Sequence, residues 1–478
     1  MQNQLEKING VITKYRNRKK YTEYKLVLTR DTEKWKIYKR YSDFHTLHKK
    51  LEERFPVESL KFTMPPKKVF GKMKEKVVSN RVSQFNTYLQ QILSSETVRQ
   101  SSLVLNFIGY CPRISGKWTK IQHKGDIPPP RTFSNIFIYE KLLYLFGGSS
   151  LKSESFNDLY SYDFEANIWK QEEIGGEAPD TKNNTIVFAN GLIYLLGGFR
   201  GEIETESFSQ NLNEFYILDI IKKQWSKIEA KGETITEQIQ AAIYHKDKIF
   251  CFSYFVTPHP TIYILDLAEN SVKKTETKNT CEATSLLNFI GVGENALIFG
   301  GKSLMTTENF GNLLILNLGE LRFREIHPLN TFTDLARHSG SLTFVPKRIS
   351  SLNSLNIEEE NIQSLPENER NPTVKSPLVG GLIIMGGYQD SHQLHSFETF
   401  FWFDLSEQKF FKILNAKLQS NSNNLEDLNQ EKYLNVPADR YGQSAIYHNN
   451  KIFLFGGGGV DEYHNKKFFN DLWVFQFD

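Results

Sequence analysis

The sequence has few cysteines and no long apolar run. Only three of the 478 residues are cysteine, Cys111, Cys251 and Cys281. This number and this spacing favour neither a disulfide framework nor a zinc cluster, and they are typical of a protein in a reducing compartment. No uncharged apolar stretch reaches the roughly 18–20 residues that a transmembrane helix requires, and the N-terminus lacks the apolar core of a signal peptide. We therefore expect a cytoplasmic protein that contacts membranes only at their surface.

The common sequence motifs of catalysis are also absent. The chain has no HExxH, GxSxG or CxxC motif and no Walker loop. Each of these motifs places a nucleophile, a metal ligand or a phosphate-binding backbone at a fixed spacing. We therefore expect no enzyme, with no catalytic residue, no metal site and no cofactor.

The charged residues are unevenly distributed. The formal net charge is +3, but residues 1–111 hold 23 of the 58 basic and 10 of the 55 acidic side chains. A basic N-terminal module is thus joined to an acidic remainder. Such a module is attracted to polyanions. The candidates are an acidic membrane, a nucleic acid and an acidic protein.

The N-terminal module has the periodicity of strands followed by helices. YTEYKLVLTR (21–30) alternates in the manner of a strand, and WKIYKR (35–40) is its expected hairpin partner. From Tyr41 the apolar residues recur at helical spacing, and we expect Ser42 as the N-cap and Asp43 in the first turn. A basic loop with paired prolines follows over 60–76, and then two further helical patterns end near residue 109.

This order of elements resembles the phox-homology (PX) domain over residues 1–111. The resemblance is carried by KRYSDF (39–44), by MPPKKVFG (64–71) and by Arg81 within SNRVSQFNTYL. It implies an α+β domain with a three-stranded sheet and helices. It also implies binding of a phosphoinositide headgroup, most often that of phosphatidylinositol 3-phosphate.

The resemblance assigns roles to individual residues. Arg40 would clamp the 3-phosphate, and Tyr41 would pack against the inositol ring. Lys67, or Lys68 as the alternative, would reach the 1-phosphate. Arg81 would hydrogen-bond the 4- and 5-hydroxyls, which disfavours lipids phosphorylated there. The chemistry agrees, because a guanidinium presents a rigid fork of donors that matches phosphate oxygens.

The tip of the basic loop is the expected point of membrane insertion. Apolar side chains there would enter the bilayer interface, and each nearby lysine would add about 1 kcal/mol of attraction to an anionic surface. The residues alone leave simpler interpretations open. Arg40 and Arg81 would then be ordinary structural or surface arginines, and the loop a solvated basic segment. The expected insertion residues are Val69, Phe70 and Met73.

The acidic remainder contains an internal repeat. A short apolar strand ending in two glycines recurs, and an aromatic strand often closes the unit, as in QWSKIEA (224–230). The repeat is similar to the kelch repeat, whose units are four-stranded blades of a β-propeller. The double-glycine copies are KLLYLFGGS (141–149), GLIYLLGGF (191–199), NALIFGGK (295–302), GLIIMGGY (381–388) and KIFLFGGG (451–458).

The resemblance implies an all-β propeller of six blades over residues 115–478. KIFCFSY (248–254) is counted as a degenerate copy, because Ser253 and Tyr254 replace the glycines. The last unit has no aromatic strand after it, whereas an orphan copy, KWTKIQHKG (117–125), precedes the first. We expect the segment around Trp118 to pair with the last blade. Residues 348–377 and 418–436 are polar insertions whose role the sequence does not identify.

Two features of the propeller leave alternatives open. His392 and His395 form an HxxH pattern in an expected loop, which surface or turn histidines explain more simply than an axial metal site of an enzyme. Arg131, Arg337 and Arg440 occupy equivalent places in three units, where arginine is often structural in kelch repeats but would also suit contact with a partner. A ubiquitin-ligase substrate receptor is a further alternative, although no BTB-like domain is present.

The sequence therefore predicts a non-enzymatic adaptor. The PX domain would recruit the protein to endosomal membranes that contain phosphatidylinositol 3-phosphate, and the propeller would bind protein partners. Nucleic acid is not expected as a partner, because neither a recognition helix nor an aromatic stacking motif is present.

Overall fold

The computed structural model describes two compact units. One comprises Met1–Pro112, Pro328–Leu335 and Glu407–Phe411, and we call it the N-terminal unit; the remaining residues form the propeller unit. The described residues are 8–17, 21–30, 33–59, 61–67, 75–110, 114–177, 185–196, 214–237, 239–253, 255, 257, 259–281, 284–303, 308–332, 334–346, 380–389, 393–415, 436–460 and 465–477.

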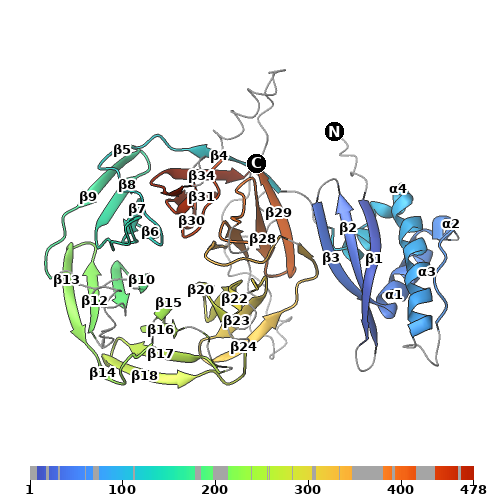
Figure 1. Cartoon of the computed structure of the whole chain (residues 1–478), viewed down its shortest axis with the longest axis horizontal. Helices are drawn as coiled ribbons and strands as arrows, with labels where there is room; N and C mark the ends of the chain where they lie inside the picture. Colours follow the sequence, from blue (N-terminus) through green and yellow to red (C-terminus); the bar gives the residue numbers. More distant parts are fainter. Residues whose placement is uncertain are drawn as a thin grey trace, which may run out of the picture. The chain divides into compact units, whose positions relative to one another are not determined.

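An antiparallel sheet covered by helices forms the N-terminal unit (Figure 1). Its main strands are β1 (Ile8–Asn17), β2 (Thr22–Arg30) and β3 (Glu33–Arg40). The helices are α1 (Tyr41–Arg54), α2 (Pro56–Ser59), α3 (Glu75–Ser94), α4 (Glu96–Arg99) and α5 (Ser102–Phe107). The expected α+β architecture is confirmed.

Alternation along β2 separates the two faces of this sheet. Tyr24, Leu26 and Leu28 are fully buried, and the residues between them are partly exposed. Beneath them, the rings of Phe44 in α1 and Phe85 in α3 stack with centroids 3.9 Å apart. The core therefore lies between the sheet and the helices, and the other face of the sheet carries the polar side chains.

Helix α1 begins without an intervening loop. Arg40 ends β3 and is also the N-cap, with extended dihedral angles of φ −95° and ψ 167°. Its backbone N–H donates to Asp43 Oδ2 at 2.7 Å, so Asp43 caps the helix from the first turn, as expected. The expectation that Ser42 is the N-cap was wrong, because Ser42 already lies inside the helix.

A distant segment extends the sheet of the N-terminal unit. Strand β25 (Thr331–Phe332) pairs antiparallel with β3, where Thr331 lies opposite Lys36. The preceding Asn330 is 1% exposed, and its side chain bonds both backbone groups of Phe410 at 2.8 Å. The three strands expected from the N-terminal sequence thus gain a fourth, which is too short to show a periodicity.

Six four-stranded blades arranged in a ring form the propeller unit, except that the first residues of β29 (Lys409–Asn415), up to Phe411, are grouped with the N-terminal unit (Figure 1). Each blade repeats the strand order found in the sequence, so the expected propeller is confirmed. The blades are β6 (Asn135–Tyr139), β7 (Leu142–Phe146), β8 (Leu159–Asp163) and β9 (Ile168–Glu172); β10 (Thr185–Ala189), β11 (Leu192–Leu196), β12 (Glu214–Asp219) and β13 (Gln224–Glu229); β15 (Ile239–His245), β16 (Lys248–Ser253), β17 (Thr261–Asp266) and β18 (Ser271–Glu276); β20 (Asn288–Val292), β21 (Asn295–Phe299), β23 (Leu313–Asn317) and β24 (Arg322–Ile326); β26 (Ser341–Val345), β27 (Gly381–Met385), β28 (Thr399–Asp404) and β29 (Lys409–Asn415); and β30 (Ser444–His448), β31 (Lys451–Phe455), β34 (Leu472–Phe477) and β4 (Ile114–Lys120).

Six short strands complete the propeller unit. Strands β5 (Lys124–Gly125) and β14 (Lys231–Gly232) add in parallel to the first and third blades. The other four form two antiparallel pairs. β19 (Thr284–Ser285) pairs with β22 (Lys302–Ser303), and β32 (Gly458–Val460) pairs with β33 (Lys466–Phe468).

Strand β4 joins the fifth and sixth blades. It pairs antiparallel with β34, where Trp118 lies opposite Phe475, and its first residues pair in parallel with β29. The indole of Trp118 is fully buried, and its Nε1 donates to the carbonyl of Phe397 at 3.1 Å. Gly116 allows the close approach, because a Cβ there would collide with the Gln476 carbonyl. One strand from the start of the propeller sequence therefore completes its last blade.

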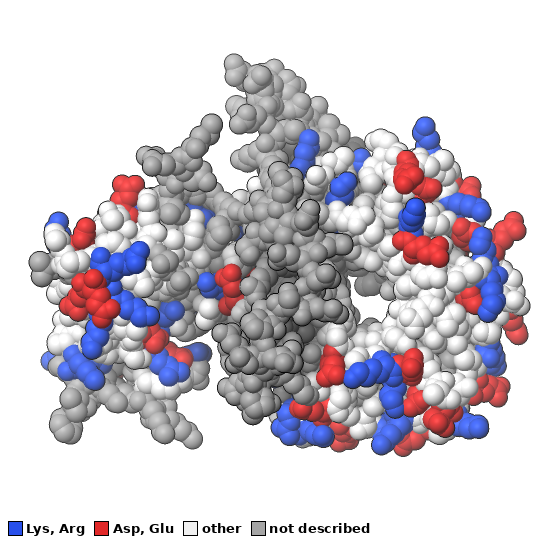
Figure 2. Space-filling model, turned by 180° about the vertical axis from the view of Figure 1, so that it is seen from behind, with Lys and Arg blue, Asp and Glu red and all other residues white. Residues whose placement is uncertain are grey.

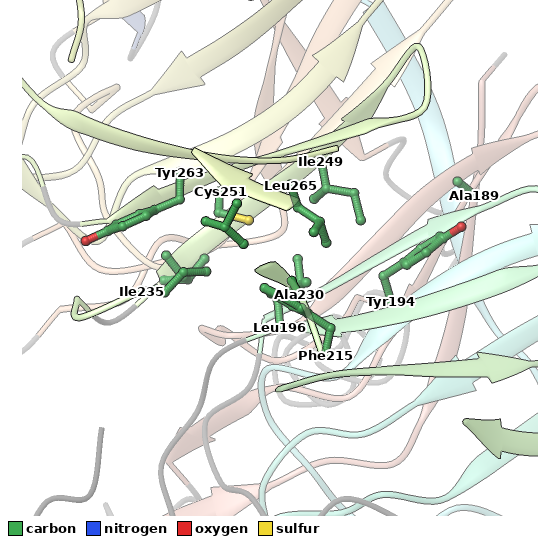
Figure 3. Packing of buried hydrophobic residues seen from close by; sticks show 12 residues of the cluster. Ala189, Tyr194, Leu196, Phe215, Ala230, Ile235, Ile249, Cys251, Tyr263 and Leu265 are labelled. Carbon is green, nitrogen blue, oxygen red and sulfur yellow. The ribbon is translucent and has the colours of Figure 1, made fainter. Parts of the chain in front are cut away.

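The blades pack against one another through apolar side chains. Figure 3 shows the cluster between the second and third blades, in which Tyr194, Leu196 and Phe215 face Cys251 and Leu265. Cys251 is fully buried, and burial raises the pKa of its thiol to about 12. The third blade, degenerate at its glycine positions, thus packs against both of its neighbours through buried apolar side chains. The two polar insertions lie almost wholly outside the described residues.

Charged side chains of both signs alternate on the surface of the propeller unit. Figure 2 shows lysine and arginine interspersed with aspartate and glutamate around the rim in that view. Several form exposed ion pairs, such as Lys246 with Glu294 at 2.7 Å. On this face the acidic excess of the sequence therefore produces no extended surface of one sign.

Candidate phosphoinositide headgroup site

Arg40 is exposed at the end of β3. Its side chain lies over the ring of Tyr21, and the distance from Cζ to the ring centroid is 3.7 Å. In the register of the sheet, Arg40 lies opposite Glu23 of β2, so Tyr21 is near the same end of the sheet. Because β3 leads directly into α1, the backbone N–H of Arg40 donates to Asp43 in the first turn of that helix.

Tyr41 connects α1 to the proline-containing loop. Its hydroxyl donates a hydrogen bond to the carbonyl oxygen of Pro65 at 2.7 Å. Burial raises the pKa of Tyr41, and the neighbouring Arg81 guanidinium opposes this shift. The phenol is thus half-buried and protonated at neutral pH, and it ties the loop to the helix.

Arg81 lies beneath Tyr41 on the inner face of α3. Its Cζ is 4.7 Å from the centroid of the Tyr41 ring, and its residue is only 6% exposed. It shares this face with Val78 and Phe85, at helical spacings of three and four residues. Burial raises the pKa of the nearby Tyr24, and Arg81 again opposes the shift. Most of the Arg81 side chain therefore contacts protein, so any direct contact with a ligand is confined to a small part of it.

Lys67 lies exposed at the end of the described part of the loop. The loop is fixed before this point by the bond from Tyr41 to Pro65 and by the Thr63 backbone N–H, which donates to Gln91 Oε1 of α3 at 2.7 Å. Lys67 thus follows a firmly held segment. The remaining expected residues, Lys68, Val69, Phe70 and Met73, lie outside the described residues.

The structure therefore brings Tyr41, Arg81 and the loop before Lys67 into contact, with Arg40 adjacent in the chain. It also adds a residue that the sequence analysis missed, Tyr21. Tyr21 begins the alternating segment 21–30 but precedes β2 by one position, and alternation alone assigns it no role in binding. A signal was available in the hairpin register, which places the start of β2 beside the end of β3.

The three equivalent arginines of the propeller are structural. Arg131 and Arg440 are fully buried, and their guanidinium groups form two-pronged ion pairs with Asp158 and Asp471. Arg337 is 1% exposed and donates to the Gly386 carbonyl oxygen at 3.2 Å. A partner on the propeller surface would not reach these side chains.

The histidine pair has no described metal geometry. His395 is 6% exposed, and its Nε2 lies 3.1 Å from the Ala336 carbonyl oxygen, whereas His392 is outside the described residues. Across the described part of the chain, no three or more His, Cys, Asp or Glu side chains are grouped so that they could hold a metal ion. Among the same residues, no helix is both long enough and apolar enough to span a membrane.

Comparisons with known proteins support both domains. The family model of the PX domain matches residues 27–111, and that of the KLHDC2/KLHL20/DRC7 Kelch-repeats domain matches residues 110–280. Human sorting nexin-13 is 36% identical over 76 residues, which are 16% of this chain and 8% of that protein.

A different kind of relative also matches. The N-(sulfonatooxy)prop-2-enimidothioate sulfolyase of Thlaspi arvense is 28% identical over 146 residues, which are 29% of this chain and 40% of that protein. The putative protein tag-53 of Caenorhabditis elegans is 23% identical over 148 residues, covering 30% of this chain and 11% of that protein. The matches thus span less than half the length of these curated relatives. Together, the fold and the family models show that the chain carries a PX domain followed by a kelch-repeat β-propeller.

Proposed function

We propose that the protein is a non-enzymatic adaptor. Its PX domain, over residues 1–111, binds phosphatidylinositol 3-phosphate on endosomal-type membranes. Its propeller, over residues 115–478, binds protein partners. The sorting-nexin similarity and the presence of the two domain types support this division of labour.

The arrangement around Tyr41 carries the lipid part of the proposal. The ring has the Arg81 guanidinium 4.7 Å from its centroid, and its hydroxyl is bonded to the loop that leads to Lys67. Arg40 precedes it and is exposed. In this proposal, the exposed guanidinium at the end of β3, the aromatic ring of α1 and the loop lysine act on one headgroup, and this set of groups suits a phosphorylated sugar-like ring.

In this proposal the residues have distinct roles. Arg40 forms charge-assisted hydrogen bonds with the 3-phosphate, Tyr41 contacts the inositol ring, and Lys67 (or Lys68) reaches the 1-phosphate. Arg81 supports the Tyr41 ring from below and bonds the 4- and 5-hydroxyls with the accessible part of its guanidinium. Val69, Phe70 and Met73 enter the bilayer interface beside the headgroup.

Liposome binding by the full-length protein tests this assignment. We expect preference for vesicles containing phosphatidylinositol 3-phosphate over vesicles with the 4-phosphate or 4,5-bisphosphate lipid. Arg40→Ala should remove this preference, because each hydrogen bond to a charged group contributes about 1.5–3 kcal/mol, which is about 10- to 150-fold in affinity. Arg54→Ala is the matched control, since Arg54 is an exposed arginine in the last turn of α1. Equal binding by the two variants would contradict the proposal.

A second candidate function is that of an enzyme acting in the propeller. The similarity to a sulfolyase favours it, and a cavity of about 400 Å³ lies between the blades, lined by Phe133, Asn135 and Leu286 among others. Elemental analysis of the purified protein distinguishes the two proposals. A stoichiometric transition metal would favour the enzyme, whereas a pull-down that returns a defined protein with residues 115–478 as bait would favour the adaptor.

A further inference from the structure

Two exposed arginines of the PX sheet lie over tyrosine rings. Arg40 Cζ is 3.7 Å from the centroid of Tyr21, and Arg16 Cζ is 4.6 Å from that of Tyr38. Both contacts are cation–π interactions between residues near the β1–β2 hairpin and residues of β3. Only the first involves a residue of the proposed headgroup site.

The contact with Tyr21 leaves the hydrogen-bond donors of Arg40 available. A ring face attracts the cation electrostatically but does not occupy the five N–H groups of a guanidinium as a carboxylate does. Within the described residues, the Arg40 guanidinium forms no other hydrogen bond or ion pair; its backbone N–H alone bonds Asp43. The stack therefore restricts the side chain while its donors remain free for an anion.

Two carboxylates near Arg40 in the sheet or in the chain bond other groups. Glu23 lies directly opposite Arg40 in the sheet, yet its Oε2 accepts from Arg16 Nε at 2.6 Å, and its side chain is only 13% exposed. Asp43 Oδ2 accepts the Arg40 backbone N–H at 2.7 Å, and its Oδ1 accepts from Ser42 Oγ at 3.3 Å. Among the described residues, neither carboxylate forms an ion pair with the Arg40 guanidinium, although both residues are near Arg40 in the chain or in the sheet.

We propose that Tyr21 is a positioning residue of the headgroup site. Its ring restricts the Arg40 guanidinium at the end of β3, so less conformational freedom is lost when the phosphate binds. This inference rests on the proposed function of Arg40. The group that Arg40 would bind is the phosphate monoester of the lipid headgroup, and not free inorganic phosphate.

Calorimetric titration of the full-length protein with short-chain, soluble phosphatidylinositol 3-phosphate tests the role of Tyr21. Tyr21→Leu removes the ring face, and we expect about fivefold weaker binding. Tyr21→Phe keeps the ring and should bind within about twofold of the unmodified protein. Tyr38→Leu removes the other exposed stack of the same sheet and should leave affinity unchanged. Inorganic phosphate should not compete at equal concentration.

A double-mutant cycle separates positioning from a purely structural role. If the ring acts through the guanidinium, Tyr21→Leu should have no further effect in an Arg40→Ala background, measured on immobilised vesicles where weak binding is detectable. Equal binding by Tyr21→Leu and the unmodified protein would overturn the inference, as would equal weakening by Tyr21→Phe and Tyr21→Leu. Undiminished binding by Arg40→Ala alone would instead refute the proposed function.

Discussion

The substitution Asp471→Asn tests whether the buried guanidinium of Arg440 stabilises the sixth blade. Arg440 is fully buried, and its Nη1 and Nη2 lie 2.6 and 3.2 Å from the two carboxylate oxygens of Asp471. Asp471 Oδ2 also accepts from Trp473 Nε1 at 2.7 Å. Burial alone would raise the pKa of Asp471, but Arg440 and Trp473 lower it below its ordinary value. The carboxylate is therefore ionised in the folded protein and compensates the arginine charge.

Removing that charge leaves the guanidinium buried without a counter-ion. Breaking a buried ion pair on one side costs about 3–5 kcal/mol. Because Arg440 still donates to the carbonyl oxygens of Ala438 and Gly456, we expect the lower end of this range, about 3 kcal/mol. The double variant Arg440→Met, Asp471→Leu should be less destabilised than Asp471→Leu alone, since no unpaired charge remains.

Urea denaturation followed by tryptophan fluorescence measures this effect. Trp118 and Trp473 lie in the sixth blade and report its unfolding. Asp266→Asn is the control, because Asp266 forms a comparable pair with Lys248 at 2.6 Å on the exposed surface and should leave the midpoint unchanged. A loss of less than about 1 kcal/mol for Asp471→Asn, equal to that of the control, would refute the reasoning.

Three further changes have definite expected outcomes. Gly116→Ala should destabilise the propeller by about 2 kcal/mol or more, because the new Cβ would collide with the Gln476 carbonyl. Faster amide hydrogen exchange in β4 and β34 would measure this destabilisation. The melting temperature of the propeller should fall as the pH falls from 7 to 5. Burial lowers the pKa of His338 below 6.5, so the His338 imidazole takes up a proton more readily in the unfolded chain than in the folded one. The His338→Gln variant should show a smaller fall in a plot of Tm against pH. Tyr41→Phe should reduce headgroup affinity about fivefold in calorimetry while the ring contact remains, because the bond to the Pro65 carbonyl is lost; unchanged affinity would show that this bond does not position the loop.

The sequence was most informative where a local pattern repeats. Double glycines after short apolar strands predict the six blades, including the third, in which Ser253 replaces a glycine, because the apolar run of the strand is retained there. It was less informative where a contact is made between distant segments. Strand β25 has two residues and thus no period, and the burial of Arg81 under Tyr41 depends on how α3 packs against α1. Helical periodicity places Arg81 on the buried face of α3. Its charge alone would have predicted a solvent-exposed position.

The stack of Arg40 on Tyr21 also joins residues that are far apart in the sequence, although the predicted hairpin already places them at the same end of the sheet. Their proximity follows from the β2–β3 register, which in turn depends on the length of the hairpin turn. The cap at Arg40 instead of Ser42 has a simpler cause: β3 leads directly into α1, and the backbone N–H that Asp43 accepts belongs to the last strand residue. In both cases the sequence shows which residue type is present but not which residue it contacts.

The joining of β4 to β34 has a consequence for protein synthesis. β4 leaves the ribosome before any complete blade, and its antiparallel partner is translated only after all the other blades. During this interval, the backbone edge of β4 lacks the strand with which it later pairs. A chain that stalls before residue 472 would keep this edge unpaired, and an unpaired strand edge favours pairing with another chain.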